Sequence, residues 1–450
     1  MEKLLLSEIA EALGTIAPFE KEITAISTDT RNLPEGCLFV AIKGDRFDGH
    51  DFIPKALESG AVVALSEKNV DGCACVVVDD TRKAYLALSG YYRRKFHPIL
   101  VGVTGSVGKT TTKEMIALVL SEKYKTLKTQ GNFNNEIGLP RTLFNLDSSY
   151  DAAVIEMGMS HFGEISRLSK TALPTTGVIT NIGFSHIENL KSQDGILKAK
   201  LEILDGMQFD SPLIVNGDDE HLGMLKKTLS ENRPVYYYGA ENSENDFYAS
   251  NIHEDDSKTF FELKYSEGKA FVEIPCVGKH NVLNAAAAFA VGIINGLKPD
   301  EIVSALKKYK PDGMRQNIVD KNGITVIIDC YNASPDSMKA SLNVLSDIKC
   351  SGRKIAVLGD MLELGTESER LHSLVGNYVH EANPDMLFCY GKDSRFIAEN
   401  CGIRSEFSDD KTLLTKEIRT YIKEGDAILF KASRGMKLEE IINALFDKED

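Results

Sequence analysis

One stretch, residues 101–112, constrains the fold of this chain more than any other. Its sequence, Val-Gly-Val-Thr-Gly-Ser-Val-Gly-Lys-Thr-Thr-Thr, predicts an apolar strand, a short loop with glycines and the start of a helix. In such a loop, backbone N–H groups and the helix N-terminus bind phosphate oxygens, the lysine reaches the β/γ-phosphates, and the next hydroxyl holds Mg²⁺. We therefore predict a nucleotide-binding loop made by Gly105, Ser106, Val107, Gly108, Lys109, Thr110 and Thr111.

This loop departs from the most common phosphate-binding pattern. That pattern has a glycine five residues before Gly108, where this chain has Val103, and the first loop glycine here is Gly105. A strand, two glycines, a lysine and two hydroxyls still follow one another in the required order. This order favours phosphate binding over a purely structural turn. The valine in place of the first glycine of the common pattern limits the protein families to which the chain can be related.

Length, charge and cysteine usage bound the function. A chain of 450 residues exceeds one ordinary core and suggests about three domains. The net charge of -14 argues against a nucleic-acid partner and against a membrane surface. Eight scattered cysteines without a Cys-x-x-Cys pair are typical of a reducing cytosol. The N-terminus is acidic and the longest apolar stretch, near residues 285–294, is about half a membrane span. We expect a cytoplasmic monomer without membrane insertion.

Hydrophobic patterns divide the chain into three α/β parts, residues 1–97, 98–312 and 313–450. The first has a short helix at 4–13 and strand-like segments at 23–27, 37–42, 62–65 and 75–78. The second alternates strands with helices, which is typical of a parallel sheet, and has strands at 99–104, 152–157, 177–182 and 213–216. An antiparallel addition at 247–252, 259–265 and 270–274 and helices at 279–289 and 299–308 complete it.

The third part begins after the turn signal Lys310-Pro-Asp-Gly313 and again alternates, with strands at 325–329, 354–358, 386–390 and 427–431. We predict an α/β protein in which a central parallel sheet with the phosphate-binding loop is flanked by a small N-terminal α/β domain and a C-terminal Rossmann-like domain.

Polar residues follow several predicted strands, and ligands of parallel sheets gather at the carboxyl ends of strands. Glu156 and His186 stand at such ends, and a helix from about residue 192 to 204 carries Lys198 and Lys200. Asn281 and Asn284, three apart, share one face near the start of their helix. Each has an ordinary alternative: a strand-end charge for Glu156, a helix cap for His186 or the asparagines, a solvated lysine for Lys200. In the last part, residues 328–336, 359–365 and 431–434 stand out at strand ends.

Together these motifs resemble the Mur ligases, the ATP-dependent amide-forming enzymes that build the peptide stem of the bacterial cell wall. The resemblance covers essentially the whole chain. It is carried by Asp29-Thr-Arg31, Leu38 to Gly44, Phe47-Asp-Gly-His50, Thr104 to Thr111, Gly131 to Pro140, Glu156-Met-Gly-Met159, His186, Lys198-Ala-Lys200, His280 to Asn284 and Asp329 to Met338. The Asn134-Asn135-Glu136 loop and the Tyr331 to Met338 string favour the branch that joins D-alanyl-D-alanine to UDP-N-acetylmuramoyl-tripeptide.

The resemblance implies roles for individual residues. ATP and Mg²⁺ are the implied cofactors, with Lys109, His186 and Lys200 as catalytic residues. The implied metal ligands are Thr110, Glu156, His186 and a carbamylated Lys200, with Lys198 as the alternative site of carbamylation. Adenine and ribose would contact Asn281, Asn284, Arg315 and Asp329. The uridine nucleotide would face Ser27, Thr28, Asp29, Thr30, Arg31 and Lys43; the muramoyl-peptide Asn134 and Asn135; and the dipeptide Asn332, Asp336, Ser433 and Arg434.

The implied reaction forms an acyl phosphate on the tripeptide carboxylate, which the amine of the dipeptide then attacks. His186 is a metal ligand in this interpretation, with a role as the base as the alternative. Two other functions stay open from sequence: a folate-type polyglutamate ligase, which should lack the first domain, and a nucleotide-dependent switch, although the Asn-Lys-x-Asp string of GTPases is absent. Whether the tripeptide ends in lysine or diaminopimelate is also open.

Overall fold

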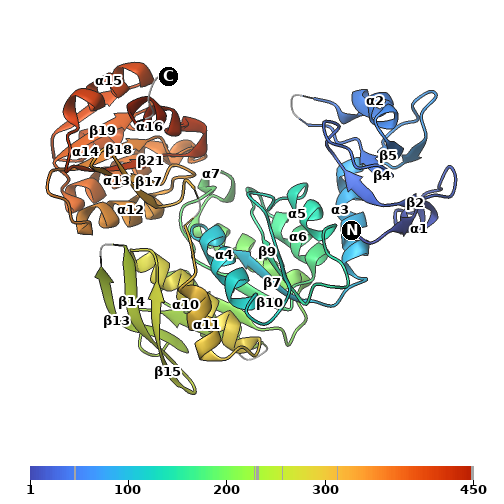
Figure 1. Cartoon of the computed structure of the whole chain (residues 1–450), viewed down its shortest axis with the longest axis horizontal. Helices are drawn as coiled ribbons and strands as arrows, with labels where there is room; N and C mark the ends of the chain where they lie inside the picture. Colours follow the sequence, from blue (N-terminus) through green and yellow to red (C-terminus); the bar gives the residue numbers. More distant parts are fainter. Residues whose placement is uncertain (45–46, 228, 230–232, 256, 312, 447–450) are drawn as a thin grey trace.

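The computed structural model describes residues 1–44, 47–227, 229, 233–255, 257–311 and 313–446. Three main sheets follow one another along the chain, of four, nine and six strands (Figure 1). This arrangement confirms the predicted α/β fold class. The predicted boundary at 97/98 falls between the strands of the first main sheet and those of the second, and that at 312/313 between the strands of the second and those of the third. Asp312 itself lies outside the described residues. No helix in the described ranges is both long and apolar enough to cross a membrane.

The N-terminal part contains a parallel sheet in the order β3-β4-β5-β6, and a two-stranded antiparallel sheet of β1 and β2. The predicted strand at 23–27 is thus wrong in one respect, because it is split between these two sheets. The elements are β1 Leu4–Leu5, α1 Leu6–Ala12, β2 Glu22–Ile23, β3 Ala25–Ser27, β4 Cys37–Val40, α2 Ile53–Glu58, β5 Ala61–Ser66, β6 Cys75–Val77 and α3 Thr81–Arg93.

The central sheet has the order β15-β14-β13-β12-β11-β10-β7-β9-β8, and β14 pairs antiparallel with both β13 and β15, as the predicted antiparallel addition requires. Its strands are β7 Ile99–Thr104, β8 Thr126–Lys128, β9 Ala152–Glu156, β10 Thr176–Ile179, β11 Leu213–Asn216, β12 Val235–Gly239, β13 Phe247–Asp255, β14 Lys258–Tyr265 and β15 Gly268–Ile274. Its helices are α4 Lys109–Leu120, α5 Gly138–Leu143, α6 Glu164–Ala172, α7 Ile187–Leu190, α8 Gln193–Leu201, α9 Glu220–Gly223, α10 Lys279–Ile294 and α11 Pro299–Leu306.

Apolar residues on both sides of β7 explain why helices cover both faces of the central sheet. Val101 and Val103 pack with α4 and α10, whereas Leu100 belongs to a core that includes α5 and α6. The alanine run of α10, residues 285–288, is fully buried, and its small side chains let α10 pack closely on α4. This packing brings the N-terminus of α10 to the phosphate-binding loop.

The C-terminal sheet has the order β16-β17-β21-β18-β19-β20, parallel except for the edge strand β16. Its strands are β16 Asn317–Lys321, β17 Ile324–Ile328, β18 Lys354–Gly359, β19 Met386–Tyr390, β20 Ser405–Ser408 and β21 Ala427–Lys431. Its helices are α12 Pro335–Asp347, α13 Ser368–Ala382, α14 Arg395–Asn400, α15 Lys411–Tyr421 and α16 Glu439–Phe446.

Candidate active site

The phosphate-binding loop joins β7 to α4 as predicted. Gly105 has φ +149°, and a Cβ there would lie 1.8 Å from the hydroxyl of Thr180. The Asn181 side-chain oxygen accepts hydrogen bonds from the backbone N–H of Ser106 (3.1 Å) and of Val107 (2.8 Å). The loop is therefore fixed from outside by two residues that follow β10. Our sequence prediction missed both, because it continued that strand to residue 182, whereas it ends at Ile179.

Lys109 is folded onto its own loop. Its ammonium donates hydrogen bonds to the carbonyl oxygens of Gly105 (2.7 Å) and Ser106 (3.2 Å). Burial lowers the pKa of Lys109, an effect that Glu156 opposes and Arg315 reinforces. A cation buried beside the loop amides is suited to receive phosphate oxygens.

Glu156, at the end of β9, holds the centre of the site. Its carboxylate accepts hydrogen bonds from the Thr110 hydroxyl (2.9 Å) and the Asn134 side-chain amide (2.8 Å). The ammonium of Lys113, fully buried on α4, lies 3.8 Å from the same carboxylate. Thr110 and Glu156 are thus brought together as the sequence predicted, and they present hard oxygen atoms to one point.

Lys200 is buried, whereas its alternative Lys198 is exposed, with its ammonium 6.0 Å from the centre of the Phe162 ring. Burial, followed by the nearby charge of Lys109, lowers the pKa of Lys200 well below its ordinary value. In the described part of the chain its amine forms no hydrogen bond or ion pair. No cluster of three His, Cys, Asp or Glu side chains suited to a metal occurs among the described residues, so a metal here needs other ligands.

The ring of His186 contacts the C-terminal domain. Its Nδ1 lies 2.6 Å from a carboxylate oxygen of Glu363, which belongs to the C-terminal domain, and the hydrogen bond from His186 lowers the pKa of Glu363. Our sequence prediction did not include Glu363, although the segment 359–365 that contains it stood out at a strand end.

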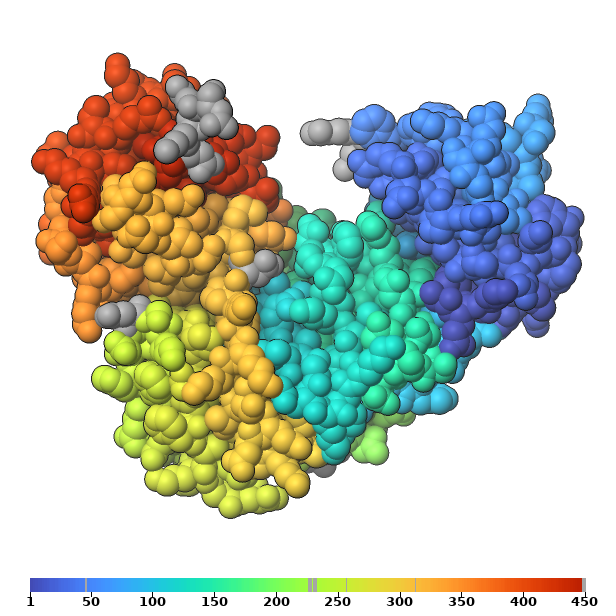
Figure 2. Space-filling model, in the orientation of Figure 1, coloured from blue at the N-terminus to red at the C-terminus, as the bar shows by residue number. Residues whose placement is uncertain are grey.

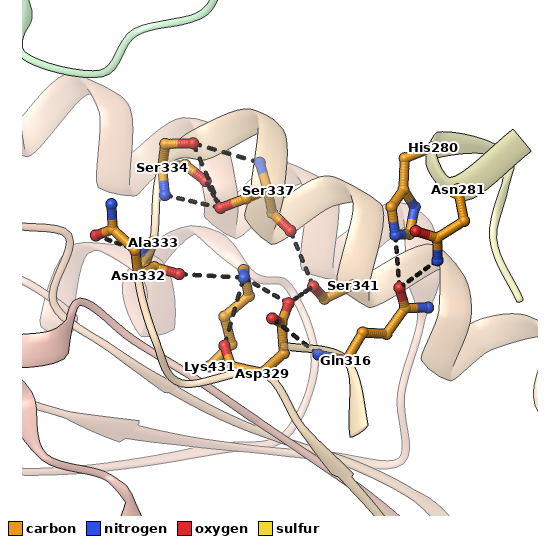
Figure 3. A network of polar contacts seen from close by, with 10 residues as sticks. All are labelled: His280, Asn281, Gln316, Asp329, Asn332, Ala333, Ser334, Ser337, Ser341 and Lys431. Carbon is orange, nitrogen blue, oxygen red and sulfur yellow. Dashed lines mark hydrogen bonds and ion pairs between the residues drawn. The ribbon is translucent and has the colours of Figure 1, made fainter. Parts of the chain in front are cut away.

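A hydrogen-bond network joins the start of α10 to the C-terminal domain (Figure 3). The side-chain oxygen of Gln316 accepts from His280 Nε2 (2.6 Å) and from the Asn281 amide (2.8 Å). The backbone N–H of Gln316 donates to Asp329 (3.2 Å), whose carboxylate also accepts from Lys431 Nζ (2.6 Å). Gln316 and Lys431 were not predicted, because their partners come from distant parts of the sequence.

These groups surround a cavity of about 530 Å³ between the central and C-terminal domains. The predicted residues that line it are Gly105, Ser106, Val107, Gly108, Lys109, Thr110, Thr111, Asn134, Asn135, Glu156, His186, Lys200, Asn281, Asn284, Arg315, Asp329, Asn332 and Asp336. Two of the residues predicted for the dipeptide lie outside the lining. Ser433 is buried and accepts a hydrogen bond from the Leu362 N–H (2.9 Å), and Arg434 pairs with Glu439 at the surface.

The predicted uridine-binding residues also lie apart from this cavity, in the N-terminal part. Arg31 pairs with Asp29 (2.6 Å), and its hydrogen bonds hold the pKa of that carboxyl far below the usual range. Lys43 forms a backbone bridge with Asp48. Figure 2 shows an open hollow above the central domain, between the blue N-terminal and the red C-terminal domains. On this face the hollow separates the N-terminal and C-terminal domains.

Comparison with known proteins decides the family. Residues 22–97 match the model "Mur ligase family, catalytic domain", residues 103–292 "Mur ligase middle domain", and residues 314–434 "Mur ligase, glutamate ligase domain". The chain is 41% identical over 463 residues to the UDP-N-acetylmuramoyl-tripeptide–D-alanyl-D-alanine ligase of Bacillus subtilis, with 99% of each chain covered. The chain belongs to the Mur ligase family.

Solved structures agree with this assignment. A crystal structure of MurF from Acinetobacter baumannii matches with a TM-score of 0.92 at 32% identity, covering all of both chains. MurF ligase of Thermotoga maritima in complex with ADP matches with a TM-score of 0.84 at 30% identity, covering 94% of this chain and 96% of that one. The resemblance inferred from the motifs, including the MurF branch, is confirmed, and the chain is a ligase.

Proposed function

We propose that this Mur ligase joins D-alanyl-D-alanine to UDP-N-acetylmuramoyl-tripeptide with hydrolysis of ATP, in the cytoplasm, as a step of peptidoglycan precursor synthesis. One observation carries the proposal: the phosphate-binding loop, the Glu156 carboxylate and groups of the C-terminal domain line a single cavity. The relatives that match over nearly the whole chain bear the name of this activity. A folate-type polyglutamate ligase should lack the first domain. Residues 22–97 match a Mur ligase model, which argues against that alternative.

The chemistry requires activation of a carboxylate, because a carboxylate is a poor electrophile. In the proposed reaction a tripeptide carboxylate oxygen attacks the γ-phosphorus of ATP, the bond from this phosphorus to the β–γ bridging oxygen breaks, ADP leaves and an acyl phosphate forms. The dipeptide amine then attacks the carbonyl carbon, a C–N bond forms, the C–O bond to phosphate breaks, and inorganic phosphate leaves with the amine losing a proton. Three anionic groups must approach one another, and Lys109 with the loop amides neutralises part of that charge.

The residues around Glu156 fit a Mg²⁺ ion. Thr110 and Glu156 offer oxygen atoms within 2.9 Å of each other, and the amine of Lys200 opens into the same cavity. A free amine reacts with CO₂ to give a carbamate, and the lowered pKa of Lys200 favours the free amine. A carbamate on Lys200 would add a hard anionic ligand where an ammonium would repel the metal. The bound ion would neutralise phosphate charge. The exposure of Lys198 supports Lys200 as the modified residue.

His186 is proposed as a further metal ligand rather than as the base that deprotonates the attacking amine. An α-amino group with a pKa near 8 is roughly a tenth neutral at pH 7, so a strong base is not essential. The carboxylate of Glu363 occupies Nδ1, which leaves Nε2 as the nitrogen available to a ligand.

Substrates are assigned to the parts of the chain as follows. Adenine and ribose are proposed to contact Asn281, Asn284, Arg315 and Asp329, and the muramoyl-peptide Asn134 and Asn135. Asn332 and Asp336, which line the cavity, are proposed for the dipeptide, whereas Ser433 and Arg434 would have to move to reach it. The uridine nucleotide is proposed to face Ser27 to Arg31 and Lys43, and the protein is proposed to act as a monomer.

Phosphate release tests the function. ATP and Mg²⁺ are supplied with UDP-muramoyl-tripeptide and D-alanyl-D-alanine, singly and together, for both lysine and diaminopimelate tripeptides. We expect release only with both substrates, and a product heavier than the tripeptide substrate by the dipeptide less water. Release that ignores both substrates would refute the proposal and favour the nucleotide-dependent switch.

A further inference from the structure

An ion pair connects the central and C-terminal domains beside the proposed metal site. His186 precedes α7 in the central domain, and Glu363 lies in the loop between β18 and α13 of the C-terminal domain. Their side chains meet at 2.6 Å, and both line the cavity. The function proposed above uses Glu363 only as the partner of His186 Nδ1 and does not explain why this partner comes from another domain.

Both residues have a left-handed backbone conformation that non-glycine residues rarely adopt. The φ angle is +62° for His186 and +64° for Glu363. Such a conformation is unfavourable for a residue with a Cβ and persists only where the surroundings hold it. Strain at both ends of one contact indicates that the geometry of the pair is maintained by the fold, which a chance surface ion pair would not require.

The surroundings that hold the pair also belong to the two domains. Helix α7 and the 3₁₀ turn Gly365–Glu367, just before α13, pack on each other. A Cβ at Gly365 would lie 2.6 Å from the side chain of Glu188, and the Arg370 guanidinium lies 5.8 Å from the centre of the Phe184 ring. Residues 184–188 and 363–370 therefore form the contact that brings Glu363 to His186 when the domains are docked.

The chemistry of a histidine ring gives this contact a consequence. A carboxylate that accepts a hydrogen bond from Nδ1–H fixes the tautomer in which Nε2 carries the lone pair, and it fixes the ring orientation as well. Metal-binding histidines commonly have such a carboxylate partner, whose loss costs about 10- to 100-fold in metal affinity. Here the partner comes from a different domain.

We propose that Glu363 is a positioning residue for His186: it presents Nε2 to the cavity, and it does so only while the C-terminal domain is docked on residues 184–188. Completion of the metal site is thereby coupled to domain docking. The inference rests on the proposed metal role of His186. A simple exposed ion pair is the competing explanation, since the Glu363 side chain is 60% exposed and exposed pairs contribute little to stability.

The test compares Glu363→Gln with the control Glu367→Gln, which removes the same charge from the same contact segment and breaks the pair with Arg370, but leaves the pair of Glu363 with His186 intact. The first readout needs no metal: ¹⁵N NMR of histidine-labelled protein at pH 8, with His186 assigned through His186→Gln. We expect a single Nδ1–H tautomer in the wild type and in E367Q, and a mixture in E363Q. The second readout is Mn²⁺ affinity by electron paramagnetic resonance with a non-hydrolysable ATP analogue.

We expect Mn²⁺ affinity about 10-fold lower in E363Q and within twofold of wild type in E367Q. An unchanged tautomer together with unchanged Mn²⁺ affinity in E363Q would overturn the proposal and leave an ordinary ion pair. Unchanged Mn²⁺ affinity in H186Q would overturn the coupling to metal, because His186 would then not be a ligand. Neither result bears on the ligase reaction itself, which the phosphate-release assay with both substrates decides separately.

Discussion

Replacement of Lys113 by methionine should destabilise the central domain strongly. The Lys113 ammonium has three buried or partly buried partners: the Thr129 carbonyl oxygen at 2.7 Å, a Glu114 oxygen at 3.1 Å and a Glu156 oxygen at 3.8 Å. Methionine has nearly the same length and shape, so the substitution removes the charge and the hydrogen bond without opening a large cavity. The Glu156 side chain is only 3% exposed, so water compensates the lost cation only weakly.

The loss of free energy of unfolding in K113M follows from the burial of the partners of Lys113. Removal of one member of a buried ion pair costs about 3–5 kcal/mol, because the remaining charge stays uncompensated. Glu156 keeps its hydrogen bonds from Thr110 and Asn134, so we expect the lower end, about 3 kcal/mol. For a domain of roughly 200 residues, 1 kcal/mol shifts the melting temperature by about 2–4 °C, so the expected decrease is about 6–12 °C.

Differential scanning calorimetry measures this shift. Since a chain of several domains does not unfold in one step, the relevant transition is the one that ADP shifts upward in the wild type. Lys128→Met is the matched control, because Lys128 contacts the same Glu114 but its side chain is 37% exposed, and its loss should cost less than about 1 kcal/mol. Equal shifts in K113M and K128M would refute the argument that burial of Lys113 sets its contribution.

Three further predictions concern the loop, the buried lysine and the response to pH. Gly105→Ala should weaken ADP binding by about 100-fold, as measured by isothermal titration calorimetry, because the φ angle of +149° disfavours a side chain and the new Cβ would lie 1.8 Å from the Thr180 hydroxyl. Wild-type affinity in this variant would contradict the prediction. In ¹³C NMR spectra of protein supplied with ¹³C-bicarbonate, the wild type and Lys198→Met should show a carbamate resonance that Lys200→Met lacks. A carbamate resonance retained in K200M would reject Lys200 as the carbamylated residue. Burial lowers the pKa of His372 in the folded protein, so below the ordinary histidine pKa of about 6.5 the unfolded chain binds more protons than the folded one, and the free energy of unfolding should fall as the pH decreases through that value. His372→Gln should reduce this pH dependence in urea titrations; the same dependence in the variant and the wild type would contradict the prediction.

The sequence predicts those parts of the fold and of the site whose signals are local. The residues of β7, the loop glycines and Lys109 lie within a dozen positions, and their order alone predicts a strand, a turn and a helix. Five short strands, β1, β8, β12, β16 and β20, were not predicted, and β1 lies where the predicted helix at 4–13 begins. They have two to five residues each, and β8, β16 and β20 lie at the edges of the two larger sheets, where a half-exposed strand needs little hydrophobic patterning.

The parts of the site that were missed depend on contacts between distant segments. Thr180 and Asn181 continue an apolar strand in sequence, but their side chains bond the phosphate-binding loop: the Thr180 hydroxyl donates to the Val107 carbonyl oxygen at 2.6 Å. This contact takes the chain out of the sheet after Ile179. Gln316 and Glu363 find their partners only because the C-terminal domain packs against the central one. No spacing in the sequence encodes such a contact.

The distribution of positive charge gives a physical reason why the site is divided between domains. Four cationic side chains among the described residues of the cavity lining are Lys109, Lys200, Arg315 and Lys431. Lys431 is already paired with Asp329, and burial of Lys200 favours its neutral form. Lys109 and Arg315 line the cavity from the two domains, and the Arg315 guanidinium lies 3.8 Å from the centre of the Tyr331 ring. If Lys109 binds the phosphates and Arg315 the nucleoside, as proposed above, ATP contacts both domains only while the C-terminal domain is docked, so we expect slow phosphoryl transfer in an undocked protein.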